Sequence, residues 1–300
     1  MMRVFRAALC LLLFLSAGGA AAQTATCSHC GKPILGRGYR LSDGRTVCEA
    51  HLEAALPRCK VCEQAMSGAY RLVGERETPV CDTCMEKYPH CWVCGEPVPP
   101  KRGRHLKDGR YLCNIDRKTA IFSPHAAGRL FDQARREVVR SLGPALVAPV
   151  GVEKVLLVDT EGMARAAADM EHEGKSPSGL TRIKVSESGG KRRHHPPTVF
   201  LLSGMPREEF LTVAAHEYGH VWHSQAHPDY FHCSRRLREG FAEWVAYKVL
   251  VKMGREGQLK KLLSGKSDSD YSEGLRRVLA LEKSVGAPGV LKYVVRNNDL

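Results

Sequence analysis

The chain has 300 residues and a formal net charge of +13, from 45 Lys and Arg against 32 Asp and Glu. Hydrophobic residues make up 43% of the sequence, enough to bury a core in roughly one to three domains. Basic clusters at Lys101–Arg104 and Lys191–His195 suit an acidic surface, a phosphate backbone or anionic lipid. They lack interleaved aromatic residues and a recognisable reading helix, which disfavours nucleic-acid binding.

Residues 1–22 have the pattern of a secretory signal peptide. Two arginines precede an apolar run from Ala7 to Leu15, and an Ala-Ala-Ala cleavage site ends at Ala22. The run is too short to span a bilayer, and no later segment reaches the roughly 20 apolar residues of a transmembrane helix. We therefore expect cleavage near Ala22 and export of the mature chain, secreted or periplasmic, without a transmembrane segment. An uncleaved amino-terminal anchor is the alternative.

Residues 23–120 contain one cysteine unit that is repeated three times with a period near 32. Each unit has two ligand pairs with two-residue internal gaps, and 17 or 18 residues separate the pairs. Such gaps suit tetrahedral zinc coordination, for which thiolate, imidazole and carboxylate are all acceptable ligands. The predicted ligands are Cys27, Cys30, Cys48 and His51; Cys59, Cys62, Cys81 and Cys84; and Cys91, Cys94, Cys113 and Asp116. We expect about three structural zinc ions, because each unit is too small to hold a core without metal.

Disulfide pairing is the competing interpretation of these cysteines, because exported chains are normally oxidised. The spacing favours zinc, since His51 and Asp116 stand in ligand register where a disulfide needs cysteine. Turn signals recur in the same places: Gly-Lys-Pro follows Cys30 and Gly-Glu-Pro follows Cys94. The segments LSDGRTVC and LKDGRYLC each contain an Asp-Gly pair, which is typical of a β-hairpin turn.

Residues 121–300 have the pattern of a mixed α/β domain. Helices are expected at Phe122–Leu142, Glu161–His172, Pro206–Ala215 and onward, Arg238–Met253, Ser272–Val285 and Gly289–Val295. Strands are expected at Val152–Val158, Leu180–Val185 and Thr198–Ser203, and loops at 174–179, 189–197 and 264–270. The last of these strands could pair with an extended peptide substrate.

The helix expected to start at Pro206 continues into His216-Glu217-Tyr218-Gly219-His220, an H-E-x-x-H motif. Residues four apart lie on one helix face, so His216 and His220 could bind one zinc ion, and Glu217 could act as general base on a water bound to it. Glu239 is the predicted third ligand, because two His and one Glu leave a position for water. Glu243, one turn further, could accept the other ring N–H of His216. The alternatives are a chance motif and a solvated helix face.

Tyr271 stands at the start of an expected helix and could donate to the oxyanion of a tetrahedral intermediate, although packing against the core is its commoner role. His223, His227 and His232 are further candidates for that donor role or are surface residues. Cys233 lies close to the predicted ligand helix, where a lone cysteine is most often buried and inert.

Cysteine units followed by this motif resemble the plant organ-size peptidase family, LIM-containing proteins described as ubiquitin-activated peptidases. The resemblance is carried by AHEYGHVW at Ala215–Trp222, REGFAEW at Arg238–Trp244 and KDGRYLC before Asp116, and it extends loosely from about Cys59 to the carboxy terminus. A LIM module has two residues between its halves, whereas seven and six separate the halves here, so the units are LIM-like. No ubiquitin-interacting segment is visible in this sequence, so the ubiquitin-linked regulation of that family is not expected for this chain.

The resemblance implies an α+β fold in which a zincin-like metallopeptidase domain, a small mixed sheet with active-site helices, follows three LIM-like zinc-finger units. Taken with the signal-peptide pattern of residues 1–22, the resemblance implies an exported gluzincin-type endopeptidase acting on a protein or peptide substrate, with one catalytic zinc ion besides the structural ones. The zinc-finger array could also bind a protein partner. The alternatives are a non-catalytic exported zinc-finger adaptor and, less favoured, a nucleic-acid-binding zinc protein.

Overall fold

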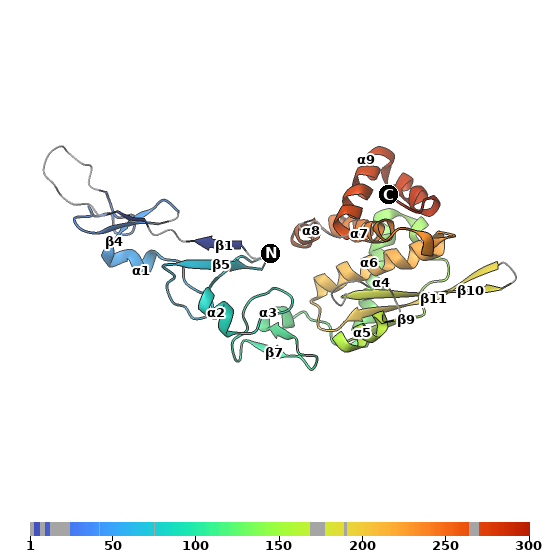
Figure 1. Ribbon diagram of the computed structural model, residues 1–300, viewed down its shortest axis with the longest axis horizontal. Helices are drawn as coiled ribbons and strands as arrows, with labels where there is room; N and C mark the ends of the chain where they lie inside the picture. The colour runs from blue at the N-terminus through green and yellow to red at the C-terminus, as the bar shows by residue number, and fades with distance from the viewer. Residues whose placement is uncertain are drawn as a thin grey trace. The chain divides into compact units, whose positions relative to one another are not determined.

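The computed structural model describes residues 3–6, 10–12, 25–41, 43–74, 76–168, 178–188, 191–263 and 270–300. It divides the chain into two compact units, Met1–Asp116 (unit 1) and Arg117–Leu300 (unit 2) (Figure 1). The predicted cleavage site at Ala22 and the expected loops at 174–177 and 264–269 lie outside the described residues. In the parts of the chain that are described, no helix is both long enough and apolar enough to cross a membrane.

Unit 1 consists of three similar repeats, each a short antiparallel hairpin followed by a helical turn. The hairpins are β3 (Gly38–Arg40) with β4 (Thr46–Cys48), β5 (Ala69–Val73) with β6 (Thr78–Cys81), and β7 (Gly103–His105) with β8 (Tyr111–Cys113). The helical turns are η1 (Glu49–His51) with α1 (Leu52–Ala55), α2 (Asp82–Lys87) and α3 (Asn114–Arg117). Within the predicted signal peptide, β1 (Arg3–Arg6) pairs with β5 and β2 (Cys10–Leu12) pairs with β3.

The same turn follows the second cysteine of every repeat. Gly31, Glu63 and Gly95 have φ values of 71°, 64° and 74°, and each backbone N–H donates to the carbonyl of the first cysteine in its repeat. The turns predicted after Cys30 and Cys94 are therefore confirmed. The middle repeat forms the same turn with a glutamate, a residue that rarely adopts this conformation.

Unit 2 contains, in its described part, a three-stranded mixed sheet in the order β10-β11-β9. Its strands are β9 (Lys154–Val158), β10 (Gly179–Ser188) and β11 (Lys191–Leu202), with β11 antiparallel to β10 and parallel to β9. Helix α5 (Thr160–Ala167) covers one face, and α4 (Pro124–Leu142) and α6 (Arg207–Ala226) lie on the other (Figure 1). The predicted mixture of helices and sheet is confirmed.

Two expectations about β11 are wrong. The segment 191–197, expected as a loop, belongs to this strand. The strand can contain Pro196 and Pro197 because both lie opposite the single residue Ile183 of β10. Two residues against one form a β-bulge, which accommodates prolines that cannot donate to the ladder. The strand at 198–202 was also expected to be free to pair with a peptide substrate. It is instead the central strand, and β10 lies at the edge.

The remaining helices follow the sheet in sequence. They are η2 (Pro144–Leu146), η3 (Tyr230–His232), α7 (Arg235–Lys252), α8 (Glu256–Leu263) and α9 (Asp270–Arg296). Ser234 caps α7 by accepting from the N–H of Leu237 at 3.1 Å. Helix α9 is broken at Gly286, whose φ of 69° is not helical, two residues before Pro288. This break agrees with the two helices predicted around that proline.

Helices α7 and α9 cross where a glycine of each helix lies against the other. A Cβ atom on Gly240 would lie 2.6 Å from the Gly274 backbone, and one on Gly274 would lie 2.6 Å from the Arg236 carbonyl oxygen. Helices α6 and α7 approach almost as closely, because a Cβ on Gly219 would lie 2.9 Å from Ala242 Cα. At these glycines the absence of a side chain lets the backbones of neighbouring helices approach closely.

Candidate metal centres and candidate active site

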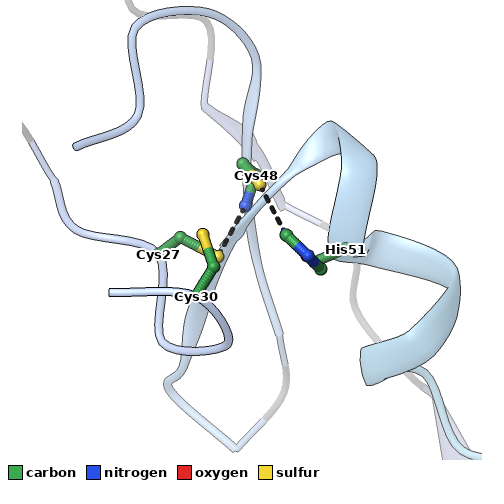
Figure 2. Close-up of side chains that lie close together, drawn as sticks. All are labelled: Cys27, Cys30, Cys48 and His51. Carbon is green, nitrogen blue, oxygen red and sulfur yellow. Dashed lines mark hydrogen bonds between the residues drawn. The ribbon is translucent and has the colours of Figure 1, made fainter. Parts of the chain in front are cut away.

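Each repeat of unit 1 brings four potential ligands together. Within each group, one ligand atom per residue lies within 4.8 Å of the others, and the groups are those predicted from the sequence. In the first repeat, Cys27 and Cys30 lie near one another and face Cys48 at the end of β4 and His51 on η1 (Figure 2). The 11 cysteines from Cys27 to Cys233 are all free of disulfide bonds. Four converging donors form a closed site that could hold a zinc ion.

A backbone N–H group points at the first sulfur in every repeat. The N–H groups of Cys48, Cys81 and Cys113 lie 3.4, 3.5 and 3.4 Å from the Sγ atoms of Cys27, Cys59 and Cys91. The contact from Cys48 is the main reason that the pKa of Cys27 falls to about 6. Cys27 therefore forms a thiolate readily, and the thiolate is the metal-binding form. Burial raises the pKa of Cys48 in the same cluster.

The second and third repeats meet at Arg76. Its Nε donates to Glu96 Oε1 at 2.9 Å, and its Nη1 lies 3.9 Å from Oδ1 of the predicted ligand Asp116. Thr78 donates to the same Glu96 oxygen at 2.8 Å. A Cβ on Gly74 would lie only 2.8 Å from the Cys94 carbonyl oxygen. The hairpin turn of the second repeat thus lies directly against the third cluster and places a positive charge beside it.

The cluster in unit 2 is built from α6 and α7. His216 and His220, one turn apart on α6, place their Nε2 atoms 3.1 Å from one another, and each Nε2 lies 3.3 Å from Glu239 Oε2 on α7. Glu239 Oε2 is buried and has no hydrogen-bond partner in the described structure. Two imidazoles and one carboxylate oxygen, gathered with that oxygen unsatisfied, fit a metal ion that keeps a further position open.

Both imidazoles have a second partner. His216 Nδ1 lies 3.5 Å from Glu243 Oε1, the arrangement predicted from the sequence. His220 Nδ1 lies 3.2 Å from the hydroxyl of Tyr230, which sequence reasoning missed. Because each Nδ1 atom is engaged, the Nε2 atoms are left to face Glu239.

The cluster is rich in negative charge. Burial lowers the pKa of His216, but the nearby carboxylates of Glu239, Glu243 and Glu217 outweigh burial and raise the pKa to about 9. Burial raises the pKa of Glu239, whereas the two imidazoles lower it more, so that it lies well below its usual value. Burial also raises the pKa of Glu243. Carboxylates gathered around two imidazoles favour a positive charge at this position.

Glu217 lies beside the cluster on the wall of a cavity of about 410 Å³, which His216 and Glu243 also line. Only 4% of Glu217 is exposed, and its Oε2 accepts a hydrogen bond of 2.7 Å from Thr181 on β10. The structure therefore brings the predicted general base to a cavity. Thr181, which lies 36 residues earlier, was not predicted to take part.

Tyr271 also lines the cavity. Its ring stacks on His216 with the centroids 5.9 Å apart, and the guanidinium of Arg235 lies 5.8 Å from the ring centroid. Burial raises the pKa of Tyr271, so its hydroxyl stays protonated and can donate. The candidate donor therefore lies next to the candidate metal ligand His216, as its expected role requires.

The other histidine candidates do not line this cavity. His223 is fully buried and its Nε2 lies 2.8 Å from the Val294 carbonyl oxygen, while His227 Nε2 lies 3.2 Å from that of Asn297. His232 is exposed. The first two therefore tie α6 and the residue after it to the carboxy-terminal segment. Cys233 is buried, as expected, and burial raises the pKa of its thiol to about 11.

His223 makes unit 2 sensitive to acid. Burial lowers its pKa from 6.5 to about 3, so below pH 6.5 the unfolded chain gains a proton that the folded chain does not. The stability from neutral His223 is complete above pH 6.5 and is lost progressively as the pH falls toward 3. Between pH 7 and pH 5, we expect a loss of about 2 kcal/mol, which His223→Gln should lack. Urea unfolding of both proteins at the two pH values measures the difference, and equal pH dependence would contradict it.

The chain is similar to zyxin over a limited stretch. It is 30% identical to zyxin of Xenopus tropicalis over 107 residues, covering 26% of this chain and 16% of the relative, and 27% identical to zyxin of Xenopus laevis with the same coverage. The chain thus spans about a sixth of the length of these relatives. This similarity supports LIM-like metal-binding repeats. No family model matches the chain, and no solved structure does.

Proposed function

We propose that the chain is an exported zinc-dependent endopeptidase, with structural zinc ions in unit 1 and a zincin-like catalytic domain in unit 2. The observation that carries the proposal is the convergence of two imidazole Nε2 atoms and an unsatisfied buried carboxylate oxygen beside Glu217, on the wall of a cavity. The resemblance to the plant LIM-containing peptidases supports the same activity. The signal-like residues 1–22 support export.

His216, His220 and Glu239 would hold the catalytic ion. When bound there, zinc supplies a Lewis acid that polarises a carbonyl and lowers the pKa of water. Glu243 and Tyr230 keep the two imidazoles oriented through their Nδ1 atoms, at 3.5 and 3.2 Å. Three carboxylates near these imidazoles favour retention of a divalent cation.

Glu217 would accept the proton of the attacking water and return it to the leaving amine. Its near-complete burial excludes bulk water, so the carboxylate has few competing partners. Tyr271, neutral and stacked on His216, would donate to the oxygen on which negative charge develops. The chain thus offers a base and an oxyanion donor on the same cavity.

The cavity and the sheet edge suggest how a peptide would bind. Strand β10 lies at the edge of the sheet and carries Thr181, which contacts Glu217. An extended peptide could add to this edge through backbone hydrogen bonds. Val213, Ala246 and Leu275 give part of the cavity an apolar lining suited to a substrate side chain.

A broad peptide-library digest tests the activity. We expect the metal-loaded protein to cleave internal peptide bonds, a chelator to abolish cleavage, and added zinc to restore it. Products are identified by mass spectrometry, which also reports the residues around each cleaved bond. The absence of cleavage by protein with full metal content would contradict the proposal.

A non-catalytic exported zinc-finger adaptor is the second candidate, favoured by the zyxin similarity, which supports the LIM-like repeats of unit 1. In that case unit 2 would hold metal without turnover, and a protein partner would bind the zinc-finger array. The library digest separates the candidates, because only a peptidase yields products that disappear with chelation and return with zinc.

A further inference from the structure

Strand β10 makes two contacts with Glu217. Gly179 and Thr181 lie two residues apart on this strand, so they face the same side, toward α6. Thr181 Oγ1 donates to Glu217 Oε2 at 2.7 Å and lies 3.2 Å from the Glu217 carbonyl oxygen. Thr181 is 5% exposed. The hydroxyl therefore meets the carboxylate where water has little access.

Gly179 leaves room for the other carboxylate oxygen. A Cβ atom at this position would lie 2.5 Å from Glu217 Oε1, 2.8 Å from Glu217 Cγ and 2.6 Å from Val213 Cγ1. All three distances are shorter than van der Waals contact. Because the Gly179 φ lies outside the left-handed region, space rather than backbone conformation requires glycine here. The strand thus holds one oxygen of Glu217 and gives space to the other.

We propose that Thr181 is a positioning residue for Glu217 and that Gly179 admits the carboxylate in the orientation that Thr181 sets. The inference rests on the proposed peptidase function, in which Glu217 carries the proton. With Oε2 engaged by the hydroxyl, Oε1 remains to accept a proton. Without the hydroxyl, a buried carboxylate would lose its hydrogen bond and turn toward another donor, away from the substrate.

Replacing Thr181 with Val or with Ser distinguishes the effect of the hydroxyl group from that of the rest of the side chain. Thr181→Val removes the donor at nearly constant volume, and we expect kcat to fall about 10-fold or more with KM and zinc content little changed. Thr181→Ser keeps the donor and should retain kcat within about threefold. Equal losses in the two variants, or a change in KM alone, would overturn the positioning role.

Gly179→Ala tests the space beside Oε1. The added methyl group should displace the carboxylate and lower kcat about 10-fold or more. It also overlaps Val213 Cγ1, so the Tm should fall as well, and kcat is measured well below the Tm of the variant. Gly128→Ala in α4 is the matched control, since a Cβ there would meet nothing within 4 Å, and it should leave kcat unchanged. Full activity in Gly179→Ala would overturn the proposed role of Gly179.

A stability measurement distinguishes failure of this inference from failure of the proposed function. Thr181→Val should lower the Tm more in the wild-type background than in a Glu217→Ala background, where the hydroxyl keeps only its 3.2 Å approach to the backbone carbonyl oxygen of residue 217. An equal Tm shift in both backgrounds would overturn the Thr181–Glu217 contact. Unequal shifts in a protein whose wild type cleaves no peptide would support the contact and overturn the peptidase proposal instead.

Discussion

The Glu217→Gln variant is expected to retain its fold and its metal ions. Its rate of peptide hydrolysis should fall at least about 100-fold, because general-base catalysis contributes a rate factor of about that size. An amide has almost the shape of the carboxylate but cannot accept a proton at neutral pH. Its oxygen can still accept the hydrogen bond that Thr181 gives to Glu217 at 2.7 Å, so the structural contact is preserved. Turnover of a peptide identified in the library digest, measured together with zinc content, checks this result.

Glu239→Ala serves as the contrasting variant. Its oxygen lies 3.3 Å from both Nε2 atoms, so its loss should lower metal occupancy in unit 2 as well as activity. Glu217→Gln should differ by keeping the metal. Undiminished proteolysis by metal-loaded Glu217→Gln would show that Glu217 is not the base, whatever Glu239→Ala does.

Chelation is expected to unfold unit 1. Each repeat has a small apolar core, such as the one formed by Ile34, Tyr39 and Val47 in the first repeat. A core of this size cannot hold the chain alone. Zinc binding at a structural site contributes about 10–16 kcal/mol, so its removal should leave the repeats unfolded. Limited proteolysis of the full chain, mapped by mass spectrometry, should show new cuts between residues 25 and 116.

Thiol reduction without chelation is the matched control, and it should leave unit 1 resistant to protease. The opposite pattern, resistance under chelation and cleavage after reduction, would revive disulfide pairing of these cysteines. Metal analysis adds a count: about four zinc ions per chain would agree with one catalytic and three structural sites. About three would leave the unit 2 site in doubt.

The ligand groups could be predicted from sequence because their geometry is local. Two-residue gaps place cysteine pairs on one turn, and the period near 32 identifies the repeats. The i,i+4 spacing of His216 and His220 fixes them on one helix face. Glu243, one turn after Glu239, was predicted to reach His216 for the same reason, and it lies 3.5 Å from the ring.

The partners that the sequence did not reveal depend on contacts between distant segments. Thr181 reaches Glu217 because β10 lies against α6, and nothing in a lone threonine indicates that packing. Tyr230 meets His220 only because the short turn η3 follows the end of α6. The two prolines of β11 predicted a loop, since a bulge that accommodates them depends on the partner strand.

The crossing of α7 and α9 at Gly240 and Gly274 fixes a dimension of the candidate site. Helix α9 begins at Asp270, so Tyr271 enters the cavity one turn before this crossing. The close approach of the two helices at these glycines positions the start of α9, where the Tyr271 ring stacks on His216. A larger residue at Gly274 would force α7 and α9 apart at the crossing, and because Tyr271 lies on α9 the distance between its ring and His216 would change with it.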